Sequence, residues 1–537
     1  MNLPAQPYPR FFNTAGPVNC ADHYCLPPLE RLNLPEILQL IQQKKYFVLH
    51  APRQVGKTSF LLALTQYLNQ SGQFTCLYVN VEVAQTARED VSRGVRAILS
   101  QLGQEAQYHL RDDFLAQIWP EILDVHGADA ALNKVLSRWA AHHITPSILL
   151  IDEIDSLVGD TLISVLRQLR SGYARRPTAF PQSVILCGVR DVRDYRIYSS
   201  EGRDMIAGGS AFNIKAESLR MGDFTQGEVE TLCQQHTRET GQVFQPQALA
   251  LMWALTQGQP WLVNALAYEV TDRLVDGRNH AKPITPDMVI QARENLILRR
   301  ETHLDQLIHK LQEERVRRVI GPMLQGVDLS EAVRQDDIQY LLDLGLVRRV
   351  QPQGLVIANP IYQEIIPREL SYITQLNLES QQRTAWYVGA NGRLDLHKLL
   401  IAFQQFFREH SEHWVERFDY KEAGPQLLLQ AFLQRIVNGG GRVEREYGLG
   451  RQRTDLALFW PYDRGVQTAV IELKLWRKSR GQTIEQGLGQ TAAYMDKIGT
   501  TDGHLVIFDR RPEISWEEKI FRAEMAHEGK RIVVWGM

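Results

Sequence analysis

The chain has 537 residues, enough for about three or four domains of ordinary size. Its 60 basic and 62 acidic residues give a formal net charge of -2, which excludes a uniformly basic nucleic-acid-coating protein but not a local basic groove. No stretch reaches the roughly 18 consecutive apolar residues of a membrane-spanning helix, and the N-terminus lacks a secretory signal pattern. Five scattered cysteines are typical of a reducing compartment, so we expect a cytoplasmic protein without membrane contact.

The cluster of Cys20, His23 and Cys25 near the N-terminus has the spacing of half a metal knuckle. No second pair of ligands lies nearby in the sequence, and a structural zinc site needs four ligands. We therefore expect these three residues to have an ordinary structural role.

The first long stretch, from about residue 44 to residue 215, alternates short apolar runs with amphipathic helical patterns. Four runs predict buried strands: Tyr46–His50, Phe74–Val81, Ser147–Ile151 and Ser183–Val189. Apolar strands separated by helices are typical of a parallel sheet covered on both faces. The expected fold class is α/β with a parallel sheet.

The second stretch, from about residue 216 to residue 370, is dominated by the helical period. Near its end, Asp336–Leu344 predicts a short helix, and Val347–Val350 and Leu355–Ala358 predict a hairpin. Helices followed by a small hairpin indicate a winged helix. The polar stretch Glu379–Arg393 is the best candidate for a linker.

The last stretch, from about residue 424, predicts a compact α/β unit of its own. Its expected elements, in chain order, are a helix (Pro425–Val437), three strands (Val443–Leu449, Thr454–Phe459 and Ala469–Lys474), a helix (Thr483–Ile498), a strand (His504–Phe508), a helix (Trp516–Ala526) and a final strand (Ile532–Trp535).

A phosphate-binding loop is predicted where the first strand meets the next helix. The residues Ala51-Pro-Arg-Gln-Val-Gly-Lys-Thr58 lie between them, with Ala51 where the first glycine of the usual pattern is expected. Gly56 lets backbone N–H groups approach phosphate oxygens, Lys57 can reach the β- and γ-phosphates, and Thr58 can ligate Mg²⁺. The predicted nucleotide-binding residues of this loop are Arg53, Gln54, Val55, Gly56, Lys57, Thr58 and Ser59.

Further polar residues follow two of the other predicted strands. Asp152 and Glu153 end one strand, and the carboxyl ends of parallel strands face the ligand crevice of an open α/β sheet. Asp152 can hold Mg²⁺, and Glu153 can polarise the attacking water. Arg190, which ends another strand, is placed to sense the γ-phosphate.

With Gly188-Val-Arg190 and the later Gly258-Gln-Pro260, these motifs resemble the STAND and archaeal-type ATPases of the AAA+ class over roughly residues 24–370. The resemblance implies that Arg190 reads the γ-phosphate and that Pro260 belongs to a lid segment that contacts nucleotide. It also implies an ATP-dependent switch with slow turnover, in which a winged helix follows the lid. The expected cofactors are ATP and Mg²⁺.

A second chemical site is predicted in the C-terminal unit. Glu472 and Lys474 are two residues apart in a strand and therefore share a face, and Asp455 can meet them if its strand pairs with theirs. Two carboxylates suit Mg²⁺ or Mn²⁺, and a lysine can position water or stabilise a developing negative charge. The alternative is a satisfied buried salt bridge.

Two features around this site agree with nucleic-acid chemistry. Gln486, Gln490 and Tyr494 recur every four residues and share one helical face. The local sequence is basic enough to neutralise phosphates, at Arg442, Arg445, Arg451, Arg453, Arg477, Lys478 and Arg480.

The C-terminal unit resembles the PD-(D/E)XK, restriction-endonuclease-like nucleases. The matching residues are Asp455, Glu472 and Lys474, together with Gln490 and Tyr494 as a Gln-x-x-x-Tyr helix motif. The resemblance implies that these five residues are catalytic, with Asp455 and Glu472 as the metal ligands. Many members carry an acid on the first helix, but residues 426–438 contain none, which leaves Glu444 or Glu446 as substitutes.

The two sites together predict an ATP-binding and ATP-hydrolysing switch that controls a metal-dependent nuclease, with DNA preferred over RNA. A role in prokaryotic defence against phage or mobile DNA and a homo-oligomer in one nucleotide state are part of this expectation. The first alternative is a nucleotide-switched scaffold whose nuclease fold binds without cutting, and the second is a DNA translocase. The expected domains are an ATPase core (1–215), a helical lid (216–310), a winged helix (311–375), a linker (376–423) and a nuclease-like domain (424–537).

Overall fold

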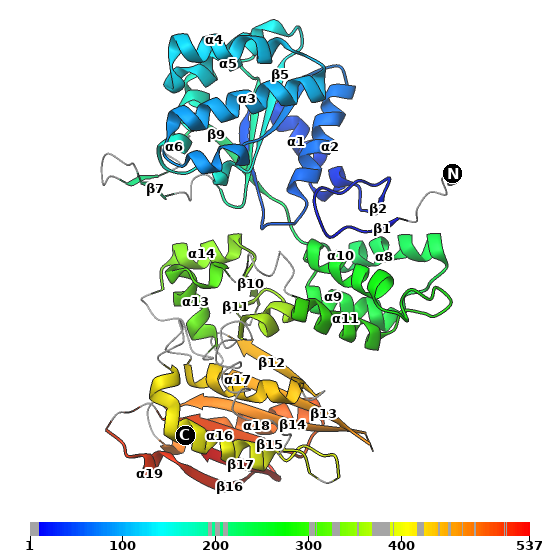
Figure 1. Ribbon diagram of the computed structural model, residues 1–537, viewed down its shortest axis with the longest axis vertical. Coiled ribbons are helices and arrows are strands. Elements are labelled where there is room, and N and C mark those ends of the chain that lie inside the picture. Colours follow the sequence, from blue (N-terminus) through cyan, green and yellow to red (C-terminus); the bar gives the residue numbers. More distant parts are fainter. Residues whose placement is uncertain are drawn as a thin grey trace, which may run out of the picture. The chain divides into compact units, whose positions relative to one another are not determined.

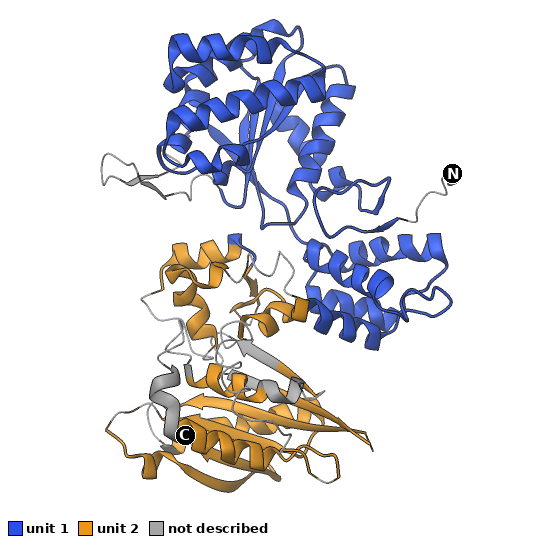
Figure 2. Cartoon of the chain, in the orientation of Figure 1, with its two compact units in different colours: residues 1–296, 343–345 blue, residues 297–342, 346–537 orange. Residues whose placement is uncertain are grey.

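The computed structural model forms two compact units, which are coloured separately in Figure 2. Unit 1 comprises residues 1–296 and 343–345, and unit 2 comprises residues 297–342 and 346–537. The structure describes residues 10–191, 196–198, 205–207, 213–299, 307, 309–324, 333–351, 354–367, 387–389, 391–415, 424–438, 441–448, 453–463, 465–476, 480–509, 511 and 513–537.

Unit 1 contains a five-stranded parallel sheet in the order β4-β5-β6-β3-β9. Figure 1 labels β5 and β9 of this sheet. The five strands are β3 (Tyr46–His50), β4 (Thr75–Asn80), β5 (Ser147–Asp152), β6 (Ser183–Gly188) and β9 (Lys215–Arg220). The first four lie where the apolar runs predicted them. The fifth, β9, was not predicted, because its sequence Lys-Ala-Glu-Ser-Leu-Arg is largely polar and it lies at the sheet edge.

Helices cover both faces of this sheet, as expected for parallel strands with apolar residues throughout. Alternate side chains of each strand pack into two separate cores. One core includes α1 (Leu34–Gln42) and α2 (Lys57–Gln70). The other includes α3 (Val91–Leu110), α4 (Phe114–His126), α5 (Ala128–His142) and α6 (Gly159–Ser171).

The rest of unit 1 is mostly helical. Its helices are α8 (Gln226–Thr240), α9 (Pro246–Thr256), α10 (Pro260–Tyr268) and most of α11 (Pro286–Arg299). The start of α8 is fixed by a capping box, in which the Thr225 side chain accepts from the Glu228 N–H and the Glu228 carboxylate accepts from Thr225. Unit 1 also contains two short strand pairs: β1 (Phe11–Phe12) with β2 (His23–Tyr24), and β7 (Arg196–Tyr198) with β8 (Met205–Ala207).

Unit 2 begins with helices and a hairpin close to those predicted. Helices α13 (Glu314–Leu324) and α14 (Gln335–Asp343) precede β10 (Val347–Val350) and β11 (Gly354–Ile357). These two strands pair antiparallel, with Val347 opposite Ile357. Most of the predicted linker stretch, residues 379–393, lies outside the described residues.

The larger part of unit 2 is a six-stranded mixed sheet in the order β12-β13-β14-β15-β17-β16. Its strands are β12 (Arg442–Gly448), β13 (Arg453–Tyr462), β14 (Gly465–Leu475), β15 (Gly503–Phe508), β16 (Phe521–His527) and β17 (Lys530–Gly536). Helix α18 (Arg480–Ile498) packs on one face, and α16 (Leu396–Val415), which packs against α17 (Gly424–Asn438), contacts the other through Phe403 and Phe508.

One predicted element of this unit was wrong. The segment Trp516–Ala526 was expected to be a single helix, but α19 spans only Trp516–Lys519 and is followed by β16, which pairs antiparallel with β17. The strand's burial alternates residue by residue, with Phe521, Ala523 and Met525 on the more buried face. This two-residue period is that of a strand and not of a helix.

None of the described helices is both long enough and apolar enough to cross a bilayer.

Candidate functional site

The loop between β3 and α2 has the backbone shape of an anion-binding turn. Gly56 lies in the left-handed region at φ +105° and immediately precedes α2, so the N-terminus of a 14-residue helix opens directly from the loop. Gln54 is also left-handed, at φ +58°. Successive N–H groups in such a turn, together with the helix N-terminus, favour a bound phosphate.

The other side chains of the loop divide by exposure. Val55 is buried in the core under α2, whereas Arg53 and Gln54 are exposed. Lys57 is buried, and its Nζ donates hydrogen bonds to the carbonyl oxygens of Ala51 at 3.0 Å and Pro52 at 2.9 Å. Its ammonium group is therefore held inside the curve of the loop.

A hydroxyl and a carboxylate meet beside the loop in the manner of an Mg²⁺ site. The Thr58 Oγ1 donates to Asp152 Oδ2 at 2.7 Å, and the Tyr78 hydroxyl donates to the same oxygen at 3.0 Å. Asp152 is fully buried at the end of β5. Oxygen ligands of these two types hold Mg²⁺ in P-loop enzymes, so the residues present fit that ion. Tyr78, which orients the Asp152 carboxylate from β4, was not identified from the sequence.

Glu153 follows Asp152 in a left-handed conformation at φ +55°, a departure from the strand that turns the chain toward the next segment. Partial burial raises the pKa of its carboxyl group, and the neighbouring Asp155 and Asp152 carboxylates raise it further. The positive charges of Lys57 and Arg53 oppose this rise. A carboxylate with a raised pKa is better matched to accepting a proton from water.

Two contacts tie the end of β6 to this region. The Asp155 Oδ1 accepts from the Val189 N–H at 3.1 Å, and the Arg190 Nε lies 3.2 Å from Asp343 Oδ2. Asp343 is 2% exposed and belongs to unit 1. Arg190 thus lies where the sequence predicted it, at the carboxyl edge of the sheet, in an ion pair that the sequence did not predict.

Pro260, the predicted lid residue, is buried in the first turn of α10. The preceding Gln259 caps this helix, since its side chain accepts from the Leu262 N–H. Gly258 has φ +79°, and a Cβ there would lie 1.9 Å from the Phe224 carbonyl oxygen. Any side chain at Gly258 would collide with the backbone at Phe224, which accounts for the glycine of the Gly-x-Pro pattern in physical terms.

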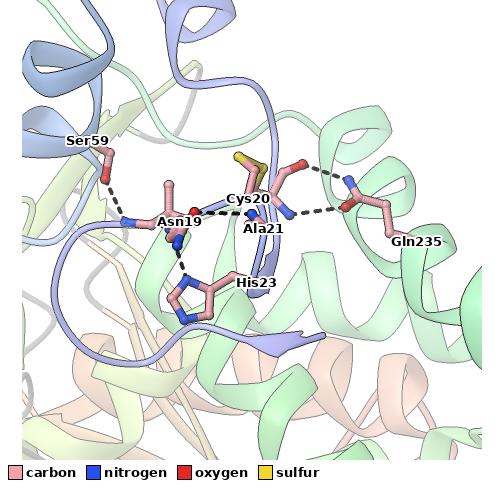
Figure 3. The surroundings of a disulfide bond; sticks show 8 residues. Asn19, Cys20, Ala21, His23, Ser59 and Gln235 are labelled. Carbon is pink, nitrogen blue, oxygen red and sulfur yellow. Dashed lines mark hydrogen bonds between the residues drawn. A yellow bond between two sulfur atoms is a disulfide. The ribbon is translucent and has the colours of Figure 1, made fainter. Parts of the chain in front are cut away.

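The N-terminal segment 13–25, which we call the strap, connects the loop helix to α8 and α10. The Val18 N–H donates to Ser59 Oγ at 2.9 Å, which ties the strap to the residue after Thr58. At its other end, the Cys25 backbone exchanges two hydrogen bonds with the Gln235 side chain of α8 (Figure 3). The Trp261 Nε1 of α10 donates to the Thr14 carbonyl at 2.8 Å.

The strap also contains a disulfide between Cys20 and Cys25 (Figure 3). The sequence did not predict it, because an odd number of scattered cysteines suggested reduced thiols. His23 does not join the two cysteines, and its Nδ1 instead accepts from the Asn19 N–H at 3.0 Å. The expectation that the Cys20, His23 and Cys25 cluster is not a metal knuckle agrees with this pairing, since both thiols are used by the disulfide.

Residues 27–366, more than half of the chain, match the family model of the AAA-like domain. The chain belongs to the AAA-like domain family. The nucleotide-site residues described above, from Arg53 to Pro260, all lie within the matched region. The AAA-like domain is a P-loop ATPase domain. This part of the chain is therefore a domain that binds and hydrolyses nucleotide.

Solved structures similar to the chain include P-loop ATPases. The Walker-type ATPase of Pyrococcus abyssi is 14% identical with a TM-score of 0.45, over 66% of this chain and 99% of that one. The RuvB Holliday junction branch migration motor of Thermotoga maritima is 14% identical with a TM-score of 0.33, over 63% and 96%. Domain III of the Thermotoga maritima replication initiation protein DnaA is 12% identical with a TM-score of 0.30, over 49% and 89%. Among curated proteins, none matches the chain.

The second predicted site lies outside the AAA-like domain, on the sheet of unit 2. Asp455 of β13 is directly opposite Glu472 of β14, so the two strands pair in the register that the sequence hypothesis required. Glu472 is 1% exposed and Lys474 is 6% exposed, and the Lys474 Nζ lies 2.7 Å from Glu472 Oε1. Among the described residues, no hydrogen bond reaches Glu472 Oε2.

The salt bridge that the sequence left as the alternative is present, between the Lys474 ammonium group and the Glu472 carboxylate. A buried carboxylate oxygen without a hydrogen bond is costly, and a cation would satisfy it. The described side chains contain no group of three or more His, Cys, Asp and Glu residues that could hold a metal ion. The Asp455 side chain lies outside that set, so its place is given by the backbone register alone.

The predicted helix residues lie on α18, which packs on the same face. Tyr494 is buried in one cluster with Leu505, which is directly opposite Glu472, and with Ile507, which is opposite Lys474. Gln490 precedes Tyr494 by one helical turn and is partly buried. Of the predicted basic residues, Arg442 pairs with Glu444 at 3.2 Å. The side chains of Arg445, Arg451, Arg453, Arg477, Lys478 and Arg480 lie outside the described residues.

Proposed function

We propose that the chain is an ATP-dependent switch of the STAND type whose AAA-like domain controls a metal-dependent nuclease in unit 2. The observation that supports the nuclease half is the buried Glu472 carboxylate, which is opposite Asp455 and ion-paired with Lys474 and whose two oxygens receive no hydrogen bond from the described residues. A structural salt bridge would satisfy both partners, whereas this arrangement leaves acceptor capacity for a cation.

In the AAA-like domain, the proposed roles follow from the contacts. Thr58 and Asp152 hold Mg²⁺, and the backbone of the loop with Lys57 binds the phosphates. Glu153 accepts a proton from the attacking water, a role that its raised pKa favours. Arg190 senses the γ-phosphate, which requires it to leave its ion pair with Asp343, and Pro260 contacts the nucleotide from the lid.

At the nuclease site, Asp455 and Glu472 are the proposed ligands of Mg²⁺, with Mn²⁺ as the alternative. When bound, the ion activates water and stabilises charge on the phosphodiester. Lys474 holds its ammonium group beside Glu472 and orients the attacking water or stabilises the transition-state charge. Gln490 and Tyr494 are the proposed substrate-contacting residues from α18.

The proposed substrate is nucleic acid, with DNA preferred over RNA. The proposal also includes a homo-oligomer that forms in one nucleotide state, a cytoplasmic location and a role in prokaryotic defence against phage or mobile DNA. An ATPase that assembles copies of the chain would bring several nuclease sites to one substrate, which gives the nucleotide state control over cutting.

A cleavage assay on the full chain tests this proposal. Linear, circular and single-stranded DNA are incubated with Mg²⁺ or Mn²⁺ and with no nucleotide, ADP, ATP or a non-hydrolysable analogue. We expect Glu472→Gln to abolish cutting and Lys57→Ala to remove its dependence on nucleotide. The matched control is Glu524→Gln, which changes an exposed acid of the same sheet and should cut as the native chain does. Cutting that survives Glu472→Gln would refute the assignment of the nuclease site.

One observation favours a second function, a nucleotide-switched scaffold that binds nucleic acid without cutting it. Helix α17 contains no acidic residue, and it carries the buried glutamines Gln426 and Gln430 where nucleases of this type often have an acid. A site with too few carboxylates would hold a cation weakly. Nucleotide-dependent DNA binding with no cleavage under any of the conditions above would establish the scaffold.

A further inference from the structure

The disulfide of the strap lies between two places where the strap is anchored. The Val18 N–H donates to Ser59 Oγ of α2 at 2.9 Å, and the Cys25 backbone exchanges hydrogen bonds of 3.1 and 2.7 Å with the Gln235 side chain of α8. The bond from Cys20 to Cys25 crosses the chain between these anchors, as Figure 3 shows. A change in this bond therefore acts on the segment that links α2 to α8.

The disulfide limits how far the two anchors can separate. Along the chain, the extended backbone from Val18 to Cys25 can span about 25 Å. Through the disulfide, whose Cα atoms are 5.4 Å apart, the same two residues can separate by only about 13 Å. Once the bond is reduced, this turn is held by hydrogen bonds such as those from the Asp22 and His23 N–H groups to the Asn19 carbonyl, at 3.1 and 2.8 Å. Such bonds open reversibly, so reduction lets the strap lengthen.

The strap also contacts residues on both sides of the nucleotide site. Ser59 directly follows Thr58, the proposed Mg²⁺ ligand. Trp261 directly follows Pro260, the proposed lid contact, and its Nε1 donates to the Thr14 carbonyl at 2.8 Å. A strap that can lengthen therefore holds these two neighbours of the nucleotide less firmly.

We propose that Cys20 and Cys25 form a thiol–disulfide exchange site whose redox state controls how tightly the AAA-like domain binds nucleotide. The reactant is a dithiol reductant. One of its thiolates attacks the Cys20 sulfur, and the S–S bond breaks as Cys25 leaves as a thiolate. The second thiol of the reductant then attacks the mixed disulfide and releases Cys20. The reductant becomes a disulfide, and the two cysteines take up the two electrons and two protons that it gives up.

The surroundings of the five cysteines confine this exchange to the strap. Cys20 is exposed and Cys25 is partly buried, so a reductant reaches the Cys20 sulfur first. The other three, Cys76, Cys187 and Cys233, are free and fully buried. Burial raises the pKa of the Cys76 and Cys233 thiols to about 12 and that of the Cys187 thiol well above its ordinary value. A thiol that keeps its proton does not take part in exchange.

The alternative is a permanent staple that only stabilises the strap. Staples of this kind are typical of secreted proteins, whereas a disulfide in the proposed cytoplasmic location is usually catalytic or redox-sensing. The inference rests on that proposed location and on nucleotide binding by the AAA-like domain. It goes beyond the proposed nuclease and does not depend on it.

Binding of a fluorescent ATP analogue to the full chain, either oxidised or reduced with dithiothreitol, tests the proposal. The loop-closure entropy of residues 20–25 corresponds to about 40-fold in an equilibrium constant, which is the upper limit of the effect. We expect reduction to weaken binding by about tenfold, and re-oxidation with oxidised dithiothreitol to restore it. The double variant Cys20→Ser, Cys25→Ser should bind as the reduced chain does, with or without dithiothreitol. Circular dichroism should show that the reduced chain and the double variant stay folded.

Two neighbouring glutamines of α8 test whether the disulfide acts through its anchor. Gln235→Ala removes the hydrogen bonds to Cys25, so it should weaken binding by the oxidised chain and leave a response to dithiothreitol of less than about twofold. Gln234→Ala changes an exposed residue beside it and is the matched control, which should keep the full response. A full response that survives Gln235→Ala would overturn the proposed route from the disulfide to the nucleotide.

Maleimide labelling of the folded chain, followed by mass spectrometry, checks the chemistry. We expect no label before reduction and labels on Cys20 and Cys25 after it. Equal binding by the two forms, with both thiols shown to be free after reduction, would refute the redox control and leave the nucleotide site in place. Labelling of both residues after treatment with oxidised dithiothreitol would also refute it, because no disulfide would then form. A chain that binds no nucleotide in either form would overturn the nucleotide site together with this inference, whereas loss of DNA cleavage alone would concern only the proposed nuclease.

Discussion

Gly258, two residues before Pro260, offers a quantitative test of how closely the start of α10 is packed. Gly258 and Gly241 have nearly the same backbone conformation, at φ +79° and φ +78°, but differ in their surroundings. A Cβ at Gly258 would lie 1.9 Å from the Phe224 carbonyl oxygen, whereas a Cβ at Gly241 has no neighbour within 4 Å. Alanine at the two positions therefore separates the cost of conformation from the cost of collision.

The expected magnitudes follow from these contacts. Gly241→Ala should cost about 1 kcal/mol, the strain of a left-handed alanine. Gly258→Ala should cost the same strain and two further contributions. It should lose the hydrogen bond from the Phe224 N–H to the Gly258 carbonyl, which is 2.8 Å long in the native chain, at a cost of about 1 kcal/mol. Displacement of the backbone at Phe224 should cost about 1 kcal/mol or more. The expected total is about 3 kcal/mol or more.

Differential scanning calorimetry on the full chain measures both variants. At roughly 2–4 °C for each kcal/mol in a domain of this size, Gly241→Ala should lower the melting temperature of the AAA-like domain by about 2–4 °C and Gly258→Ala by about 6–12 °C. Gly258→Ala should also weaken binding of a fluorescent ATP analogue, because the proposed nucleotide contact of Pro260 would move with it. Equal shifts for the two variants would refute the packing argument.

Two further predictions concern the nucleotide site. Glu153→Gln should bind ATP normally and hydrolyse it at least about 100-fold more slowly. Only the native chain should lose activity as the pH falls through the raised pKa of Glu153, because the protonated acid cannot accept a proton. A phosphate-release assay across pH measures both effects, and a variant that loses activity at low pH as the native chain does would contradict the assigned role. Tyr78→Phe keeps the ring but removes a hydrogen bond to the Asp152 carboxylate. It should therefore destabilise the chain by about 1.5–3 kcal/mol without nucleotide and raise the Mg²⁺ concentration needed for half-maximal hydrolysis. An unchanged Mg²⁺ requirement would show that Tyr78 does not orient the Asp152 carboxylate.

The sequence predicted the parts of the fold that depend on strong local patterns. The strands β3, β4, β5 and β6 are continuous apolar runs because both faces of the parallel sheet are covered, and such runs are visible without a structure. The edge strand β9 carries charged residues and has no such pattern. In β16, alanine and glutamate favour helix locally, and the sheet edge at β17 overrides that preference.

The candidate sites were predictable to a similar extent. The loop residues of the AAA-like domain have a fixed spacing, so Gly56, Lys57 and Thr58 could be named from the sequence. Tyr78 and Asp343 could not, because they reach Asp152 and Arg190 from distant parts of the chain. The register that sets Glu446 opposite Asp455 and Glu444 opposite Ala457 also required the structure, since a shift of one residue in strand register changes every cross-strand partner and leaves the sequence unchanged.

The strap has a practical consequence for any study of the AAA-like domain alone. The family match begins at residue 27, after the strap has ended. A fragment cut to the family boundaries would lose the Val18 contact to Ser59 and the Thr14 contact to Trp261, both of which are backbone-mediated and span from the phosphate loop to the lid. Nucleotide affinity measured on such a fragment would therefore differ from that of the whole chain, in which the strap holds α2, α8 and α10 together through these hydrogen bonds.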